Sequence, residues 1–135
     1  MNHWLVKSEP FKYSWDHLVA EKTGVWDGVR NYAARNNLMS MKVGDLVLFY
    51  HSNEGKEVVG LARVSKEHYP DPTTDDPRWV VVELQPVEKF PKTVTLEQVK
   101  ADKRLQHIPL VTQSRLSVQP IGKPEFDIIV SLAHD

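Results

Sequence analysis

The sequence predicts an α+β fold, a small mixed β-barrel with short helices at its periphery. Three observations predict it. An apolar run over residues 46–50 and a β-rich segment over residues 57–64 flank a polar turn at 53–56, which indicates a hairpin. Helix signals lie between the predicted strands and at the end of the chain, which favours a mixed arrangement over a parallel sheet. A length of 135 residues suits one hydrophobic core, so residues 1–135 are expected to form a single domain.

The first half of the chain begins with a predicted strand over residues 3–7, which ends before Pro10. Ser14 is suited to cap a helix over residues 15–22, because apolar residues follow it at positions i, i+3 and i+4. Gly28 predicts a turn, and a short helix is expected after it. The hairpin strands over 46–50 and 57–64 complete this half.

The second half opens with a loop over residues 68–77, which holds three prolines and three aspartates. A strand is expected over 78–84, and Thr95 with Gln98 forms a capping box for a helix over 96–104. Alternating polar and apolar residues predict a strand over 113–118. Pro124, at a first helical position, predicts a closing helix whose apolar residues recur at i, i+3, i+4 and i+7.

Composition excludes several classes of protein. With 41% hydrophobic and 26% charged residues the chain is globular in composition, and it has no cysteine for a disulfide or a thiolate zinc site. No apolar run approaches the roughly 20 residues of a membrane span, and the start lacks the apolar stretch of a signal peptide. We therefore expect no membrane partner and a cytoplasmic protein, or a nuclear one in a eukaryotic cell.

The sequence shows no pattern that indicates a catalytic site or a metal site. The six histidines are never paired at i, i+2 or i+4, so no local metal site is expected. Lys7 next to Ser8 could pair a base with a nucleophile, but neighbours on a strand point to opposite faces. No nucleophile elbow, P-loop or dinucleotide motif is present, and nothing selects a pair of carboxylates. The chain is therefore predicted to be no enzyme and to need no cofactor.

The segment from Trp26 to Asn37 stands out by its chemistry. Its twelve positions hold one indole, one phenol, two guanidiniums, three carboxamides and one carboxylate. An aromatic face can stack on a nucleic acid base, and amide and guanidinium groups can match the base edge. The alternative is a buried polar network that ties down a loop. Trp26 has Arg30 rather than an apolar partner at i+4, so it is expected at a pocket wall and not in the core.

Phosphate contacts are expected to be few and local, because the net charge of the chain is −1. The cations available to hold the phosphates that flank a bound base are Lys7, Arg30, Arg35 and Arg115.

Several long motifs, in the right order over nearly the whole chain, resemble the EVE domain. They are Lys7-Ser8-Glu9-Pro10, Trp26-Asp27-Gly28-Val29-Arg30-Asn31-Tyr32, Ala34-Arg35-Asn36-Asn37-Leu38, Phe49-Tyr50-His51-Ser52-Asn53, Val59-Gly60-Leu61-Ala62, Tyr69-Pro70-Asp71 and Ser114-Arg115-Leu116-Ser117-Val118. The resemblance implies a PUA-like pseudobarrel that reads modified bases, especially modified cytosine in DNA.

The resemblance also implies which residues form the pocket. By likeness, the base-binding residues are Trp26, Asp27, Arg30 and Asn31, with Ser8, Tyr50, His51 and Ser117 on the other walls. Two positions depart from the family pattern, since Ala33 stands where Gln is frequent and Met39 where Arg is frequent. Both changes reduce polarity near the site and bear on its fine preference and on backbone binding.

The expected partner is a nucleic acid with a modified base, DNA rather than RNA, together with an effector protein that acts on what is read. Two alternatives remain open from the sequence. One is an enzyme that acts on a modified base or nucleotide, and the other is a protein-interaction domain with exposed aromatic surface and no polar pocket.

Overall fold

The computed structural model describes residues 1–135 and contains one six-stranded sheet with the strand order β2-β5-β4-β3-β1-β6. All neighbouring strands are antiparallel except β1 and β3, which are parallel, so the sheet is mixed. The strands are β1 (His3–Ser8), β2 (Gly24–Trp26), β3 (Leu46–His51), β4 (Glu57–Pro70), β5 (Val80–Thr95) and β6 (Val118–Ile121). The α+β class predicted from the sequence is confirmed.

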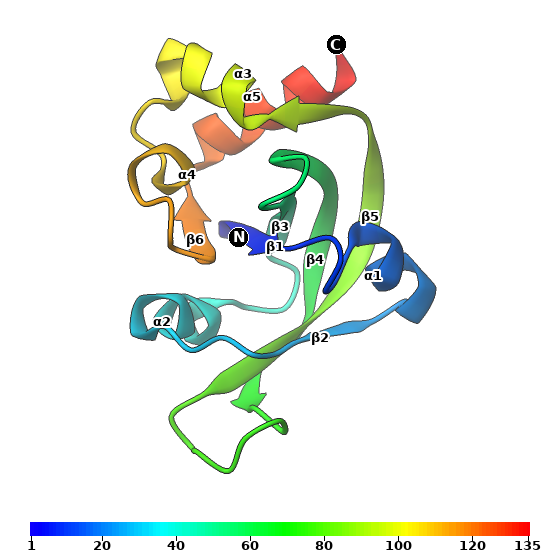
Figure 1. Ribbon diagram of the computed structural model, residues 1–135, viewed down its shortest axis with the longest axis vertical. Helices are drawn as coiled ribbons and strands as arrows, with labels where there is room; N and C mark the ends of the chain where they lie inside the picture. Colours follow the sequence, from blue (N-terminus) through cyan, green and yellow to red (C-terminus); the bar gives the residue numbers. More distant parts are fainter.

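Short helices lie around this sheet (Figure 1). They are α1 (Trp15–Glu21), α2 (Tyr32–Ser40), α3 (Leu96–Ala101), the 3₁₀-helix η1 (Lys103–Leu105), α4 (Pro109–Thr112) and α5 (Lys123–His134). None of them is both long and apolar enough to cross a membrane.

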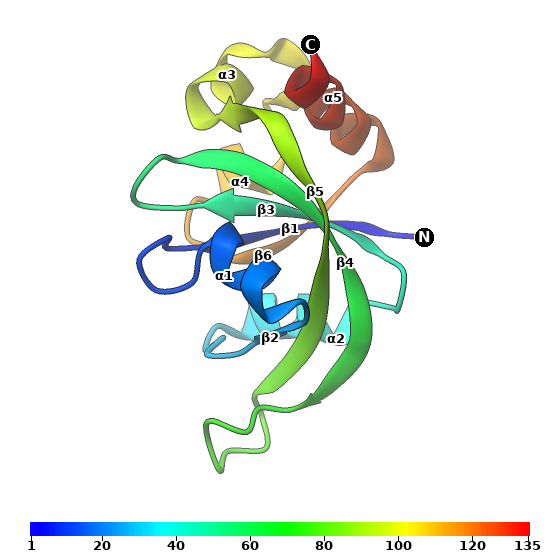
Figure 2. The same ribbon diagram turned by 90° about the vertical axis from the view of Figure 1, so that its right-hand side faces the viewer.

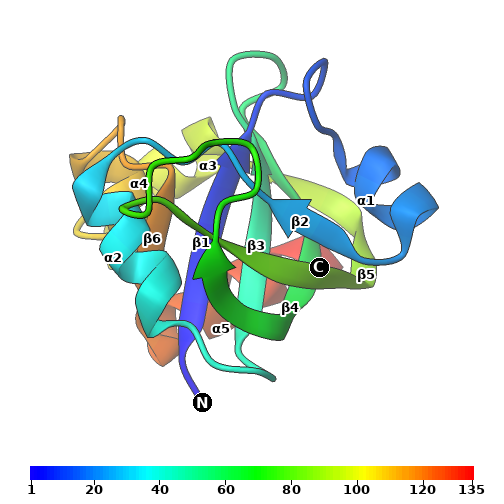
Figure 3. The same ribbon diagram turned by 90° about the horizontal axis from the view of Figure 1, so that it is seen from below.

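The sheet is strongly curved but not closed. β4 and β5 are 14 and 16 residues long and run along most of the molecule (Figure 2). Their pairing shifts register at several points, and such bulges bend and twist a strand pair. The edge strands β2 and β6 have only three and four residues and do not pair with each other. Instead α2 packs against both β6 and β5 (Figure 3). Because the sheet does not close, the small mixed β-barrel expected from the sequence is not confirmed.

Both faces of the sheet are covered, and the strands alternate between two hydrophobic clusters. On β1, Trp4 and Val6 belong to one cluster, while Leu5 belongs to the other. The first cluster lies under α1, α2 and β2, and the second under α3, α4 and α5. On β3 the same alternation sends Phe49 to the first cluster and Tyr50 to the second. This sidedness decides which side chains can reach a site built around β2.

Several local predictions are confirmed. The hairpin of β3 and β4 forms, Ser14 caps α1, and the Thr95–Gln98 capping box starts α3. The closing helix forms as α5, with Gly122 as its N-cap and Pro124 in its first turn.

Other local predictions are wrong. The strand expected over 113–118 is a turn, closed by the Leu116 N–H donating to the Gln113 carbonyl at 3.0 Å, and β6 begins only at Val118. β6 is an edge strand, which tolerates Pro120 because no second neighbour needs its missing N–H. β4 runs on to Pro70 and β5 runs from Val80 to Thr95, while the helix expected over 96–104 divides into α3 and η1. No helix was expected where α4 lies.

Candidate nucleic acid base site

A cleft of about 830 Å³ opens beside β2 on the face that carries the first hydrophobic cluster. Its walls come from the end of β1, the loop that leads to α1, β2 with the segment after it, and single residues of two distant loops. Six residues predicted from the sequence lie around this cleft: Lys7, Ser8, Trp26, Asp27, Arg30 and Ser117. The fold therefore brings together side chains more than 100 positions apart.

Trp26 lies at the boundary between the cleft and the core. Its side chain is only 7% exposed, and its ring packs edge-on against Tyr13 and Phe49 at centroid distances of 5.9 and 5.5 Å. Trp26 therefore belongs to the core, contrary to the expectation that was based on helical i+4 spacing. That expectation fails because Trp26 lies on a strand, opposite Val82, where i+4 spacing has no meaning. The indole Nε1 forms no hydrogen bond within the protein and is not fully buried.

Tyr13 completes an aromatic corner with Trp26 and was not among the site residues expected from the sequence. Its hydroxyl donates a hydrogen bond of 2.6 Å to Glu21 Oε1. Burial raises the pKa of the Tyr13 phenol, and the Glu21 carboxylate raises it further, so the ring stays neutral. A Cβ on Gly24 would lie 2.2 Å from the Tyr13 hydroxyl oxygen. The glycine thus permits the close approach of Tyr13 to β2, and it was the one sequence signal for this contact.

The polar walls of the cleft retain hydrogen-bonding capacity. The Ser8 hydroxyl donates to the Tyr13 carbonyl at 2.6 Å, which leaves its oxygen lone pairs free to accept. The Asp27 side chain is exposed, lines the cleft, and forms no hydrogen bond or ion pair within the protein. Ser117 is partly buried and also lines the cleft. A free carboxylate, hydroxyl groups and an indole N–H together suit a ligand that carries both donors and acceptors.

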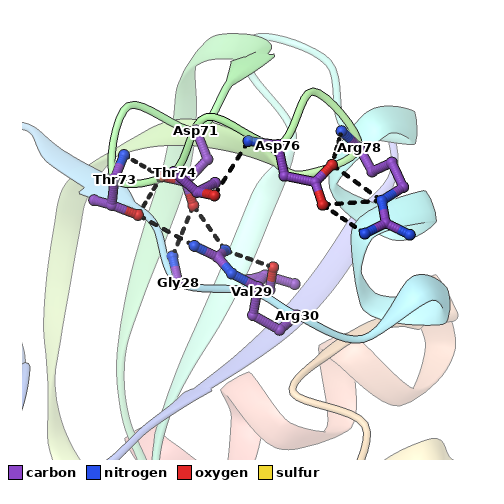
Figure 4. A network of polar contacts seen from close by, with 8 residues as sticks. All are labelled: Gly28, Val29, Arg30, Asp71, Thr73, Thr74, Asp76 and Arg78. Atoms are coloured by element: carbon purple, nitrogen blue, oxygen red, sulfur yellow. Dashed lines mark hydrogen bonds and ion pairs between the residues drawn. The ribbon is translucent and has the colours of Figure 1, made fainter.

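Arg30 is held in place by a buried carboxylate from the loop between β4 and β5 (Figure 4). Asp71 is 2% exposed and accepts hydrogen bonds from Arg30 Nη1 at 3.0 Å, from the Gly28 N–H at 3.1 Å and from both the N–H and the hydroxyl of Thr73. Burial alone would raise the pKa of Asp71, but these hydrogen bonds outweigh it and lower the pKa to about 2. Gly28 has φ of +76°, a conformation that favours glycine, and this turn aims its N–H at Asp71.

The charges around the cleft are mixed. Lys7 Nζ donates to the Ser114 carbonyl at 2.7 Å, and burial lowers the pKa of this lysine. Lys12 lies 3.6 Å from Glu9, and Arg30 pairs with Asp71. The cleft consequently offers no strong positive field, and recognition there depends on individual hydrogen bonds and on the aromatic corner.

Three residues that the resemblance assigned to the pocket lie elsewhere. Tyr50 points to the opposite face of the sheet and packs in the second hydrophobic cluster, with Lys7 Nζ 6.0 Å from its ring. His51 Nε2 accepts the Trp15 N–H at 3.1 Å and so fixes the start of α1. Asn31 is the N-cap of α2, where its side chain accepts the Ala34 N–H at 2.9 Å. Each of these side chains has a structural role in the present arrangement.

Two of the predicted backbone-binding cations lie outside the cleft lining. Arg35 extends from α2 and donates to Asn36 Oδ1 and to the Arg78 carbonyl. Arg115 is exposed in the turn before β6, next to Ser114, the partner of Lys7. No group of three or more His, Cys, Asp or Glu side chains is arranged to hold a metal ion.

The model of the EVE domain family matches residues 2–132. Thymocyte nuclear protein 1 of Mus musculus is 39% identical over an alignment of 165 positions that covers 97% of this chain and 73% of the relative. A crystal structure of a protein from Agrobacterium tumefaciens has a TM-score of 0.96 and 46% identity, and the match covers 98% of this chain and 93% of that one.

A further solved structure contains a ligand. The crystal structure of human THYN1 in complex with 5-methylcytosine-containing DNA has a TM-score of 0.93 and 36% identity, and the match covers 100% of this chain and 99% of that one. The superposed region includes every element that lines the cleft.

Proposed function

Because this chain belongs to the EVE domain family, we propose that it is a reader of modified bases, a single domain that holds a modified cytosine of DNA in the cleft beside β2. The observation that carries the proposal is the combination of an aromatic corner, Trp26 with Tyr13, and a free carboxylate, Asp27, in one cleft. The DNA complex of human THYN1 supports the choice of ligand.

The chemistry of cytosine fits these groups. Its exocyclic N4 amino group is a donor, and aspartate is suited to accept from it. Its O2 and N3 atoms are acceptors, for which the Trp26 Nε1 and the hydroxyl of Ser117 supply donors. The flat ring can stack in the aromatic corner, and a 5-methyl group adds apolar area there. The size of the cleft, about 830 Å³, lies within the range usual for small-ligand pockets.

The remaining predicted residues support the site from outside. Lys7 lines the cleft, Arg115 follows the Ser114 that accepts from Lys7, and Arg35 lies on α2, and we assign these three cations to the phosphates next to the bound base. His51, Asn31 and Tyr50 then act indirectly, by positioning α1, α2 and Lys7. Binding rather than catalysis is the proposed activity, and no metal or cofactor is assigned to it.

The proposal also covers the cellular setting. A reader of this size requires an effector protein to act on what it has bound, and it works where its nucleic acid is, in the cytoplasm or in the nucleus of a eukaryotic cell. We interpret the curved sheet with α2 as a pseudobarrel of the PUA-like kind.

Direct binding tests the proposal. Fluorescently labelled DNA and RNA oligonucleotides, single-stranded and duplex, with and without one 5-methylcytosine, are titrated with the protein. The expected result is tighter binding of DNA that contains the modified base. Asp27→Asn should weaken that binding by about 10- to 150-fold, because a hydrogen bond to a charged group contributes about 1.5–3 kcal/mol.

The matched control is Asp127→Asn on α5, an exposed carboxylate far from the cleft, which should bind like the wild type. Equal affinity for modified and unmodified oligonucleotides would refute base reading. A change in the mass of the oligonucleotide during incubation would instead indicate an enzyme.

A further inference from the structure

A cluster of two aromatic rings and two guanidinium groups lies beside the cleft, where the start of α2 meets the loop between β4 and β5. We call Tyr32, Arg35, Arg78 and Trp79 the platform. The Tyr32 ring is 51% exposed and lies 5.1 Å from the Trp79 ring, inclined by 34°. The Arg35 guanidinium lies 5.1 Å from the Tyr32 ring, and that of Arg78 lies 5.8 Å from Trp79.

The platform is held in a fixed arrangement by polar contacts. Arg78 Nη1 donates to the Tyr32 hydroxyl at 2.8 Å, and Arg35 Nη1 donates to the Arg78 carbonyl at 3.3 Å. Asp76 in turn binds the Arg78 guanidinium, and Asp71 anchors the start of the same loop to Gly28 (Figure 4). The exposed ring is therefore oriented before any ligand arrives, which reduces the entropy cost of stacking on it.

The charges of the platform are mostly neutralised. Arg78 is paired with Asp76, and the neighbouring Arg30 is paired with Asp71. Arg35 differs, because its side-chain partners are the neutral Asn36 carboxamide oxygen and a backbone carbonyl. The platform thus offers a π face and one uncompensated positive charge. This combination fits one base and one phosphate and does not fit a run of phosphates.

Arg30 connects the platform to the cleft. It lines the cleft, and its guanidinium also lies 5.8 Å from the Trp79 ring. The cleft and the platform therefore share Arg30 as a common neighbour.

We infer that the platform binds the nucleotide adjacent to the base that is read, with its base stacked on Tyr32 and its phosphate on Arg35. The inference rests on the proposed function of the cleft. It implies that the adjacent nucleotide is unpaired in the complex, so the ligand is a single strand or a locally opened duplex.

The test is a thermodynamic cycle between the protein and the oligonucleotide. Wild type and Tyr32→Ala are titrated with single-stranded DNA that contains one 5-methylcytosine, and with the same DNA carrying an abasic site on the 5′ or the 3′ side of that base. Stacking of one base on an aromatic side chain contributes about 1–3 kcal/mol, so Tyr32→Ala should weaken binding of the intact strand at least about fivefold. The wild type should bind one of the two abasic strands more weakly than the intact strand, by a similar factor. For that abasic strand, Tyr32→Ala should cause no further loss of affinity.

Two controls accompany the cycle. Tyr32→Phe keeps the ring and should bind within about twofold of wild type. Because Tyr32 is half exposed, thermal unfolding of the alanine variant should match wild type. For the phosphate contact, Arg35→Gln should reduce the slope of log affinity against log salt by about 0.7, while Arg63→Gln, an exposed arginine on β4 with a neutral partner, should leave the slope unchanged.

The outcomes separate this inference from the proposed function. The inference about the platform would be overturned if Tyr32→Ala bound the intact strand with wild-type affinity. It would also be overturned if Tyr32→Ala lost the same affinity for strands with and without the abasic sites. Neither result would affect the proposed function of the cleft. If Tyr32→Ala loses affinity in the cycle while the wild type does not distinguish modified from unmodified cytosine, the platform stands and base reading fails. If the wild type binds none of these strands, both the inference about the platform and the proposed function are refuted.

Discussion

Asp71 holds Gly28 and Arg30 in place at the edge of the cleft. The Asp71→Asn variant should therefore lower the free energy of unfolding. The carboxylate is 2% exposed and accepts four hydrogen bonds, which lower its pKa from a usual value of 3.8 to about 2. A shift of this size corresponds to about 2 kcal/mol of stability at neutral pH. A domain of this kind is stable by about 5–15 kcal/mol in total, so the loss is easily measured.

The assay is urea unfolding of wild type and Asp71→Asn between pH 7 and pH 2. Because the pKa of Asp71 is lower in the folded than in the unfolded chain, its contribution is complete well above pH 3.8 and is lost as the pH falls toward 2. At pH 7 the variant should unfold at a urea concentration lower by about 1 M. The difference between the two proteins should shrink toward zero at pH 2.

Other carboxylates also titrate in this range, since hydrogen bonds from Arg78 and Arg104 lower the pKa values of Asp76 and Asp102 to about 2. The comparison therefore uses the difference between variant and wild type, in which their effects cancel. Asp75→Asn, an exposed position in the same loop, is the control and should change stability by less than about 0.5 kcal/mol. A stability difference for Asp71→Asn that does not change with pH would refute the reasoning.

Three further predictions concern the cleft. Trp26→Ala should cost about 3–5 kcal/mol of unfolding free energy by urea titration, because the ring belongs to the core, and a folded variant of wild-type stability would contradict that placement. Gly24→Ala should weaken base binding severalfold in the fluorescence titration, because its Cβ would meet the Tyr13 hydroxyl at 2.2 Å, and unchanged affinity would show that the aromatic corner is not used. The slope of log affinity against log salt should lie between about −1.5 and −3.5, since two to four phosphate contacts are expected, chiefly from Lys7, Arg35 and Arg115, and a slope near −10 would exclude this binding mode.

Local signals in the sequence were enough to predict most helices and the central hairpin. Helix caps act within four residues, so Ser14 and Thr95 indicate where α1 and α3 begin. Features that depend on distant pairing were not predictable. β5 contains Pro86, which argues against a central strand, yet β2 pairs only with Val82 to Leu84. Beyond that point β5 has one neighbour, and its free side accommodates the missing N–H.

The candidate site was predictable in its chemistry and only partly in its geometry. The first part of the polar segment, Trp26 to Arg30, does line the cleft, whereas the rest of it caps and forms α2. The partner of Arg30 lies 41 positions away, and no local pattern joins it to Asp71. The position of Tyr50 was open to a better argument, because neighbours on a strand point to opposite faces and Phe49 is the one that faces Trp26.

The floor and the walls of the cleft differ in how they depend on the fold. The floor of the cleft is Trp26, which is part of the hydrophobic cluster that holds β2 on the sheet. Any substitution of Trp26 therefore also changes the stability of the fold. Asp27, by contrast, is exposed and bonded to nothing else in the protein. A ligand that binds the folded state and not the unfolded state stabilises the fold by mass action. In the proposed complex, one residue, Trp26, would contribute both to the hydrophobic core and to the contact with the base. Base preference can therefore change through substitutions in the walls at little cost in stability, whereas the aromatic floor is constrained by folding and by binding together.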